Sequence, residues 1–325
     1  MRKFLLALLA LLILAGAGGA WWARGQYLDP GPLAEATPIV IARGGTEQIG
    51  QTLVERGVLE DARAFPIAVW LTREEGPLRA GEYLFPARAS LREVLSVLRT
   101  ARPVQRRLTI PEGLTAKQMA VLIGQAEGLT GDTPAFGEGE LLPETYAYQW
   151  GDNRAAIVRR AGAAMREALD RLWKERAEGL PLASPREALV LASIVERETG
   201  QAAERAHVAG VFINRLRRGM MLQSDPTVAY AAADGGVLDR PISRADLDRD
   251  HPFNTYRIRG LPPGPIASPG LEALRATLQP MATEDLYFVA DGTGGHAFAR
   301  TLEEHNRNVA RWRAIERQRS QSATQ

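Results

Sequence analysis

A run of apolar residues ends in two carboxylates between Leu189 and Gly200 (LVLASIVERETG). At the spacing of an α-helix, Leu191, Ile194 and Glu198 share one face, so Glu198 lies one turn beyond side chains that face a core. Partial burial of a carboxyl disfavours its charged form and raises its pKa, which keeps a proton available near neutral pH. The segment therefore predicts a general acid at Glu198.

The other carboxylate, Glu196, points about 200° away around the same helix and shares its face with Leu189, Ala192 and Ser193. A solvated helix end without catalytic function is the alternative interpretation of the Glu-Arg-Glu triplet. The polar segments that follow in the sequence favour a catalytic site over this alternative.

Composition narrows the possible functions. The chain has 325 residues, of which 45% are hydrophobic, which is enough for a sizeable core and for two domains besides a membrane segment. Its net charge is only +2, and its basic residues are scattered among acidic ones, so we expect no nucleic-acid partner. The absence of cysteine excludes disulfides, thiolate nucleophiles and thiolate metal ligands.

Motifs for other kinds of catalysis are missing. His207, His251, His296 and His305 lack the paired spacing of metal ligands, so we expect neither a metal nor another cofactor. No serine lies in a Ser-x-x-Lys or Gly-x-Ser-x-Gly setting, which leaves serine acyl transfer without a nucleophile. The glycine-rich segment 292–295 is interpreted as a hairpin turn and not as a phosphate loop.

The N-terminus predicts a membrane anchor. Arg2 and Lys3 precede an uncharged run from Phe4 to Trp22, which is closed by Arg24. The run has about 19 residues, close to the roughly 20 that span a bilayer as a helix. The basic pair places the N-terminus in the cytoplasm, so we expect a single-pass protein of the inner (cytoplasmic) membrane with its bulk outside the cytoplasm. A cleaved signal peptide, cut within the small residues 15–20, is the alternative.

Helix and strand signals predict an α+β fold with two parts. Residues 1–24 form the anchor, 25–36 a linker, 37–102 a small α+β module, 103–318 a larger α+β domain and 319–325 a tail. In the small module, strands are expected at 38–42 and 81–85. Its helices are expected from a Thr46 cap to Gly57, at 65–71, and after a Ser90–Glu93 capping box.

The larger domain is also expected to combine helices and strands. Four helices are predicted. One follows a Thr115–Gln118 capping box, two occupy 153–173 and 206–216, and one runs from Ser184-Pro185 to Glu198. Strands are expected at 107–110 and 287–290. Segments 128–139, 219–227 and 251–270 are expected to be loops.

Two of these loops carry polar groups that can gather around Glu198. Aromatic rings beside amides and hydroxyls suit a sugar, whose faces are apolar and whose edges are polar. Turn formation alone also explains each loop. The candidate substrate-binding residues are Gln223, Ser224, Asp225, Thr227, Asn254, Thr255 and Tyr256.

Taken together, these segments resemble the endolytic murein transglycosylases of the YceG-like family. The resemblance extends over about residues 38–311, and the Glu198-Thr199 pair is similar to a Glu-Ser pair that holds the family's catalytic glutamate. Glu196 lies in the same matching block and is the fallback for that role. The blocks, in order, are 138–146, 192–199, 210–216, 222–227, 254–256, 260–266 and 287–290.

The resemblance implies a LysM-like module after the anchor and a catalytic domain with a lysozyme-like active-site helix. It also implies cleavage between N-acetylmuramic acid and N-acetylglucosamine within nascent peptidoglycan strands, which leaves 1,6-anhydro ends and terminates strand elongation. Peptidoglycan glycan strands are the implied substrate. Peptidoglycan synthases such as penicillin-binding proteins are the implied partners.

Two other functions stay open from the sequence. One is a muramidase-type hydrolase in which Asp225 acts as nucleophile or water base opposite Glu198, with the two carboxyls about 5–9.5 Å apart. The other is a non-catalytic scaffold that binds wall glycan and recruits partners.

Overall fold

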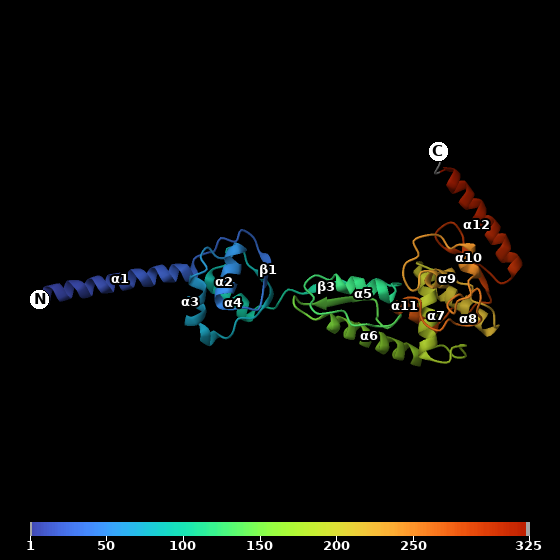
Figure 1. Cartoon of the computed structure of the whole chain (residues 1–325), viewed down its shortest axis with the longest axis horizontal. Helices are drawn as coiled ribbons and strands as arrows, with labels where there is room; N and C mark the ends of the chain where they lie inside the picture. The colour runs from blue at the N-terminus through green and yellow to red at the C-terminus, as the bar shows by residue number, and fades with distance from the viewer. Residues whose placement is uncertain (1, 323–325) are drawn as a thin grey trace. The chain divides into compact units, whose positions relative to one another are not determined.

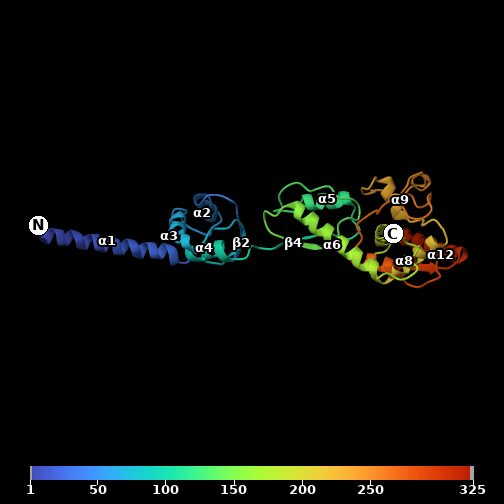
Figure 2. The same cartoon turned by 90° about the horizontal axis from the view of Figure 1, so that it is seen from below.

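The computed structural model describes residues 2–322 and divides the chain into two compact units, both of mixed helix and strand (Figures 1 and 2). Unit 1 contains the residues up to Arg106 together with Glu127–Leu129 and Ala147–Asp152. Unit 2 contains Arg107–Ala126, Thr130–Tyr146 and the chain from Asn153 onward. The predicted α+β class is confirmed.

The predicted apolar helix at the N-terminus is also confirmed, as α1 (Arg2–Leu28). Within it, Leu6–Leu28 is long and apolar enough to cross a membrane, with a mean hydropathy of 2.0. The predicted end at residue 24 is wrong, and 25–28 are helix and not linker. No proline occurs before Pro30, and Tyr27 packs against the core of unit 1, which extends the helix.

The rest of unit 1 wraps three helices around a two-stranded sheet. Strand β1 (Thr37–Ile41) pairs antiparallel with β2 (Gly81–Phe85), in a register that places Thr37 opposite Phe85. The helices are α2 (Thr46–Glu55), α3 (Ala64–Leu71) and α4 (Leu91–Thr100), with a 3₁₀ turn, η1 (Arg73–Glu75), after α3. Phe65, Tyr83 and Phe85 are fully buried among them.

Of two helix caps predicted in unit 1, one is confirmed and one is wrong. The capping box at α4 is confirmed, because the Ser90 and Glu93 side chains each bond the other's backbone N–H. The cap predicted at Thr46 is wrong, since Thr46 is the first residue of α2 and Gly45 is the cap. Gly45 makes no side-chain bond and supplies the extended backbone that precedes the helix.

Strand β3 (Arg106–Thr109) begins at the last residue of the first stretch of unit 1 and pairs with β4 (Thr145–Tyr148). Unit 2 also contains α5 (Ala116–Gly124), whose predicted Thr115–Gln118 capping box is confirmed. Its main helices are α6 (Arg154–Lys174), α7 (Pro185–Glu198), α8 (Arg205–Arg217) and α11 (Leu271–Leu278). Helix α7 packs against the other three and against α9 (Asp225–Ala232). Every residue of α7 from Ala188 to Val195 is buried.

The remaining elements complete unit 2. They are η2 (Ala202–Glu204), α10 (Arg244–Asp248) and a hairpin of β5 (Tyr287–Ala290) and β6 (His296–Ala299), followed by α12 (Leu302–Ser322). The hairpin turn predicted at 292–295 is confirmed. The loop predicted through residue 227 is wrong, because α9 begins at Asp225 with Pro226 in its first turn, where proline is tolerated. Residues 319–322 of the predicted tail are helix, and 323–325 lie outside the described residues.

Candidate active site

Helix α7 brings Glu198 to the edge of the core. Ser184 caps its start by accepting a hydrogen bond from the Glu187 N–H, and Pro185 occupies the first turn. Glu198 is the last helical residue, because Thr199 has extended backbone angles. The helix is buried from Ala188 to Val195 and ends in a partly buried carboxyl.

Burial raises the pKa of Glu198 from 4.5 to about 7. The Ser224 hydroxyl donates a hydrogen bond to Glu198 Oε1 at 2.5 Å and lowers this pKa, because the bond favours the carboxylate. The negative charge of Asp225 raises it, and the positive charge of Arg215 lowers it. The carboxyl therefore ionises close to neutral pH, where it can both give and take a proton.

Ser224 is held by a small network of buried hydroxyls. Its N–H donates to Thr255 Oγ1 at 2.9 Å, and its carbonyl accepts a hydrogen bond from Thr227 Oγ1 at 2.6 Å. The Thr227 and Thr255 hydroxyls are themselves 2.8 Å apart. These bonds fasten the start of α9 to the 254–256 loop, and so fix the hydroxyl that faces Glu198.

Gln223 has an unusual backbone. Its φ angle is 47°, in the left-handed region that residues other than glycine rarely adopt. Its N–H donates to the Thr255 carbonyl at 3.1 Å, which helps hold this conformation. The bend lies between buried Leu222 and buried Ser224 and leaves the Gln223 side chain exposed. Such strain is frequent where a binding site imposes the conformation.

A second acid lies beside the first. Asp225 is exposed in the first turn of α9 and accepts a hydrogen bond from the Tyr256 hydroxyl at 2.6 Å. Burial and the Asp225 carboxylate raise the pKa of Tyr256, so the phenol remains a neutral donor. Together they present a carboxylate and an aromatic ring next to Glu198.

Asn254 is fully buried and supports Tyr256. Its amide donates to the carbonyls of Asp246, Leu247 and Arg249 at 3.2, 3.0 and 2.8 Å. Its Oδ1 accepts the Tyr256 N–H at 3.0 Å. Asn254 thus links α10 to the loop that carries Tyr256.

Glu196 has different surroundings. Its Oε2 accepts the N–H of Gly270, the cap residue of α11, at 2.9 Å, and Arg205 lies 3.6 Å from its Oε1. Only 6% of the side chain is exposed. Burial raises the pKa of this carboxyl too. Glu196 therefore fastens α7 to α11 and does not face Ser224.

Arg215 is a member of the site that the sequence interpretation left out. It is buried, and its guanidinium donates to the carbonyls of Leu286 and Leu222, both at 2.6 Å. It also lies 5.3 Å from the centre of the Tyr287 ring. An arginine in the run 208–216, which is apolar apart from Asn214, is the signal that could have identified it, since a buried cation needs partners.

Comparison with known proteins identifies the family of the chain. The model of the YceG-like family matches residues 39–311. A protein of Streptococcus pneumoniae (serotype 2, strain D39) named endolytic murein transglycosylase is 30% identical, over 95% of this chain and 65% of its own length. A Bacillus subtilis protein (strain 168) of the same name is 39% identical over 52% of this chain and 46% of its own length.

The chain thus spans a little under two thirds of the length of the S. pneumoniae relative. A crystal structure of a YceG-like protein from Listeria monocytogenes is similar in fold, with a TM-score of 0.50 and 27% identity. That similarity covers 84% of this chain and 99% of the Listeria chain. The chain therefore belongs to the YceG-like family.

Proposed function

We propose that this protein is an endolytic murein lytic transglycosylase, a lyase that cuts peptidoglycan strands between N-acetylmuramic acid and N-acetylglucosamine. The observation that carries the proposal is Glu198, a carboxyl with a pKa of about 7 at the edge of the core. The name endolytic murein transglycosylase that two relatives carry supports the substrate and the reaction.

One carboxyl is sufficient for this reaction. Protonated Glu198 donates its proton to the glycosidic oxygen as the bond to C1 of the muramyl residue breaks. The resulting carboxylate then takes the proton of the C6 hydroxyl as that oxygen bonds to C1 and closes the 1,6-anhydro ring. Glu198 regains its proton, and no water is consumed. The new anhydro end terminates the strand.

The neighbours of Glu198 divide into two groups by exposure. Gln223, Asp225 and Tyr256 are exposed or partly buried, and we assign them contacts with the sugars and with the positive charge that develops at C1. The other four candidates are buried and bonded to one another or to the backbone, and we assign them positioning roles: Ser224, Thr227, Asn254 and Thr255.

The reaction product tests the proposal. Purified glycan strands are digested in ¹⁸O-labelled water, and the new muramyl ends are weighed by mass spectrometry. Ends that are lighter by one water and carry no label support the transglycosylase. Labelled reducing ends would show hydrolysis and overturn it.

Asp225 supports a second candidate, a muramidase-type hydrolase. Its charge raises the pKa of Glu198, so the two carboxyls lie within electrostatic reach of each other, as in two-carboxylate glycosidases. In that reaction Asp225 attacks C1 or activates a water, and the label appears in the product. The same digestion therefore decides between the two candidates.

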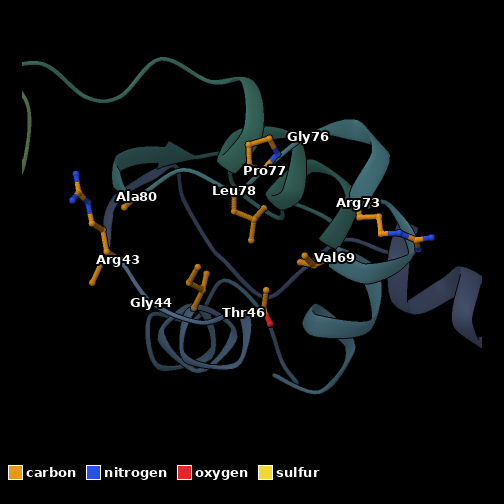
Figure 3. A pocket seen from close by; sticks show the side chains of 11 residues that line it. Arg43, Gly44, Thr46, Val69, Arg73, Gly76, Pro77, Leu78 and Ala80 are labelled. Atoms are coloured by element: carbon orange, nitrogen blue, oxygen red, sulfur yellow. The ribbon is translucent and has the colours of Figure 1, made fainter.

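We also assign glycan binding to a LysM-like module in unit 1. A cavity of about 610 Å³ lies between the segment that follows β1 and the segment that precedes β2, and Figure 3 shows Leu78 directed toward Thr46 within it. Apolar Ile49 and Val69 line it together with polar Arg43, a mixture that suits sugars. Ala42→Trp at the exposed rim is expected to weaken binding of inactive Glu198→Gln protein to purified peptidoglycan. Unchanged binding would contradict this assignment.

We infer the cellular location of the protein from α1. We place Phe4–Trp22 across the inner membrane as an uncleaved anchor, with the N-terminus in the cytoplasm and the catalytic unit outside it. Peptidoglycan synthases such as penicillin-binding proteins act on the same strands and are the expected partners. N-terminal sequencing of protein extracted from membranes tests the anchor. A mature chain that begins between Gly16 and Trp22 would identify a signal peptide instead.

A further inference from the structure

Helix α3 carries an apolar face that is largely exposed to solvent. Ile67, Trp70 and Leu71 have exposed fractions of 61%, 63% and 64%. Residues three and four apart lie on one side of a helix, so the three side chains form a single patch, which we name the α3 face. Large apolar side chains gathered on a surface indicate a docking site.

The α3 face differs from the sides of the helix that already have a function. Phe65 and Ala68 point into the core of unit 1. Val69 lines the cavity to which we assigned glycan, together with Arg73 of η1. A sugar bound in that cavity would therefore leave the α3 face uncovered.

The position of α1 indicates what covers it. Ile67 and Leu71 line a groove of about 490 Å³ together with Trp22 and Tyr27 of α1. Figures 1 and 2 both show α3 at the end of unit 1 from which α1 extends. Trp21 and Trp22 are exposed near the end of the apolar run, where tryptophan marks a membrane–water interface. The α3 face lies beside that interface if α1 spans the membrane.

The edge of the face suits lipid headgroups. The Arg73 guanidinium lies 5.0 Å from the centre of the Trp70 ring, which holds a cation next to an aromatic side chain. Aromatic and aliphatic side chains with a flanking cation are typical of helices that lie in the interface of a bilayer.

We propose that the α3 face lies on the lipid bilayer beside the point where α1 leaves it, with acyl chains filling the groove between α1 and α3. This inference rests on the proposed anchoring by α1. A second attachment prevents unit 1 from swinging about α1 and keeps its glycan cavity at a fixed height above the membrane. Strands close to the membrane are then the ones it captures.

The cysteine-free chain allows a direct test with single spin labels. The full chain is reconstituted in vesicles of phosphatidylethanolamine and phosphatidylglycerol, with labels on Ile67→Cys or Leu71→Cys. The matched control is Leu84→Cys, because Leu84 is a 54% exposed leucine on β2 of the same unit. Labels at 67 and 71 are expected to collide several-fold more with oxygen, which dissolves in lipid, than with a water-soluble nickel complex. The label at 84 is expected to show the reverse preference.

A further label, on Ile13→Cys in α1, separates this inference from the anchoring itself. If the label at position 13 collides mainly with oxygen while the labels at 67 and 71 collide mainly with the nickel complex, α1 is inserted in the bilayer but the inference is overturned. If the label at position 13 also collides mainly with the nickel complex, the proposal that α1 is a membrane anchor fails as well. Spin–spin broadening at 67 and 71 that grows with the protein-to-lipid ratio would identify a second copy of the chain as the partner, and would also overturn it.

Discussion

The Ser224 hydroxyl donates a hydrogen bond to Glu198 Oε1 at 2.5 Å and so joins the last residue of α7 to the residue that precedes α9. Burial raises the pKa of the Glu198 carboxyl, and this bond lowers it. The resulting pKa of about 7 depends on a serine that exchanges no proton in the proposed reaction.

Replacing this serine is expected to shift the pH dependence of cleavage. Ser224→Ala removes a donor to the carboxylate, so the pKa of Glu198 rises further. The fall in kcat/KM at alkaline pH should therefore move to higher pH. The control is Ser193→Ala, which removes another buried hydroxyl of unit 2, one that bonds Val190 and Ile266. An alkaline fall that stays in place in Ser224→Ala, or moves in both variants, would contradict this prediction.

Substitution of the two glutamates of α7 is expected to have different effects, on activity for Glu198 and on stability for Glu196. Glu198→Gln keeps the shape of the side chain but cannot supply a proton, so cleavage should fall by about 10²-fold or more while the fold persists. Glu196→Gln still accepts the Gly270 N–H but loses the attraction to Arg205, so it should lower the melting temperature and retain most of the activity. Turnover and thermal unfolding of both purified variants test this. An active Glu198→Gln beside an inactive Glu196→Gln would exchange the two roles.

The sequence predicted those features that depend on nearby residues. The burial of α7 follows from its own apolar run, and the capping boxes at Ser90 and Thr115 form within three residues of sequence. The proposed choice of Glu198 over Glu196 rested on helix geometry, which separates the two carboxyls by about half a turn, and on the resemblance of Glu198-Thr199 to the family's Glu-Ser pair.

Contacts between distant residues could not be predicted in this way. Ser224 lies 26 residues from Glu198, and Gly270 lies 74 residues from Glu196. Helix α11 has only eight residues, too few for a periodic signal, and it forms because Leu274 and Leu278 pack into the core around α7. Asn254 was expected to bind sugar from its residue type, whereas its amide bonds backbone carbonyls that only the folded chain brings together.

Protein stability should report the burial of Glu198 independently of activity. In the unfolded chain this carboxyl ionises near pH 4.5, and in the folded chain near pH 7. Between these values the folded state binds more protons, so stability falls as pH rises through that window. Glu198→Gln has no carboxyl at this position, so it does not lose stability in this way. The free energy of unfolding of Glu198→Gln minus that of the natural protein should therefore be about 3 kcal/mol larger at pH 8 than at pH 4.

Urea unfolding of both proteins at the two pH values measures this difference. Glu196→Gln is measured alongside, and because burial also raises the pKa of Glu196, its stability relative to the natural protein should change with pH in the same direction. A stability difference between Glu198→Gln and the natural protein that is the same at pH 4 and pH 8 would show that the pKa of Glu198 is not raised.

The charge of Asp225 is expected to act on Glu198 in the opposite sense to the Ser224 hydroxyl. Asp225→Asn removes a negative charge that raises the pKa of Glu198, so the alkaline fall in kcat/KM should move to lower pH. The asparagine oxygen can still accept the Tyr256 hydroxyl, which preserves the local structure. Tyr256→Phe is the complementary variant, because it removes the hydrogen bond from the Tyr256 hydroxyl but keeps the charge of Asp225, and its alkaline fall should not move to lower pH. In a transglycosylase, Asp225→Asn slows cleavage at pH 7 but still yields unlabelled 1,6-anhydro ends in ¹⁸O-water. Complete loss of cleavage at every pH would instead make Asp225 a direct participant at C1, as the hydrolase mechanism requires.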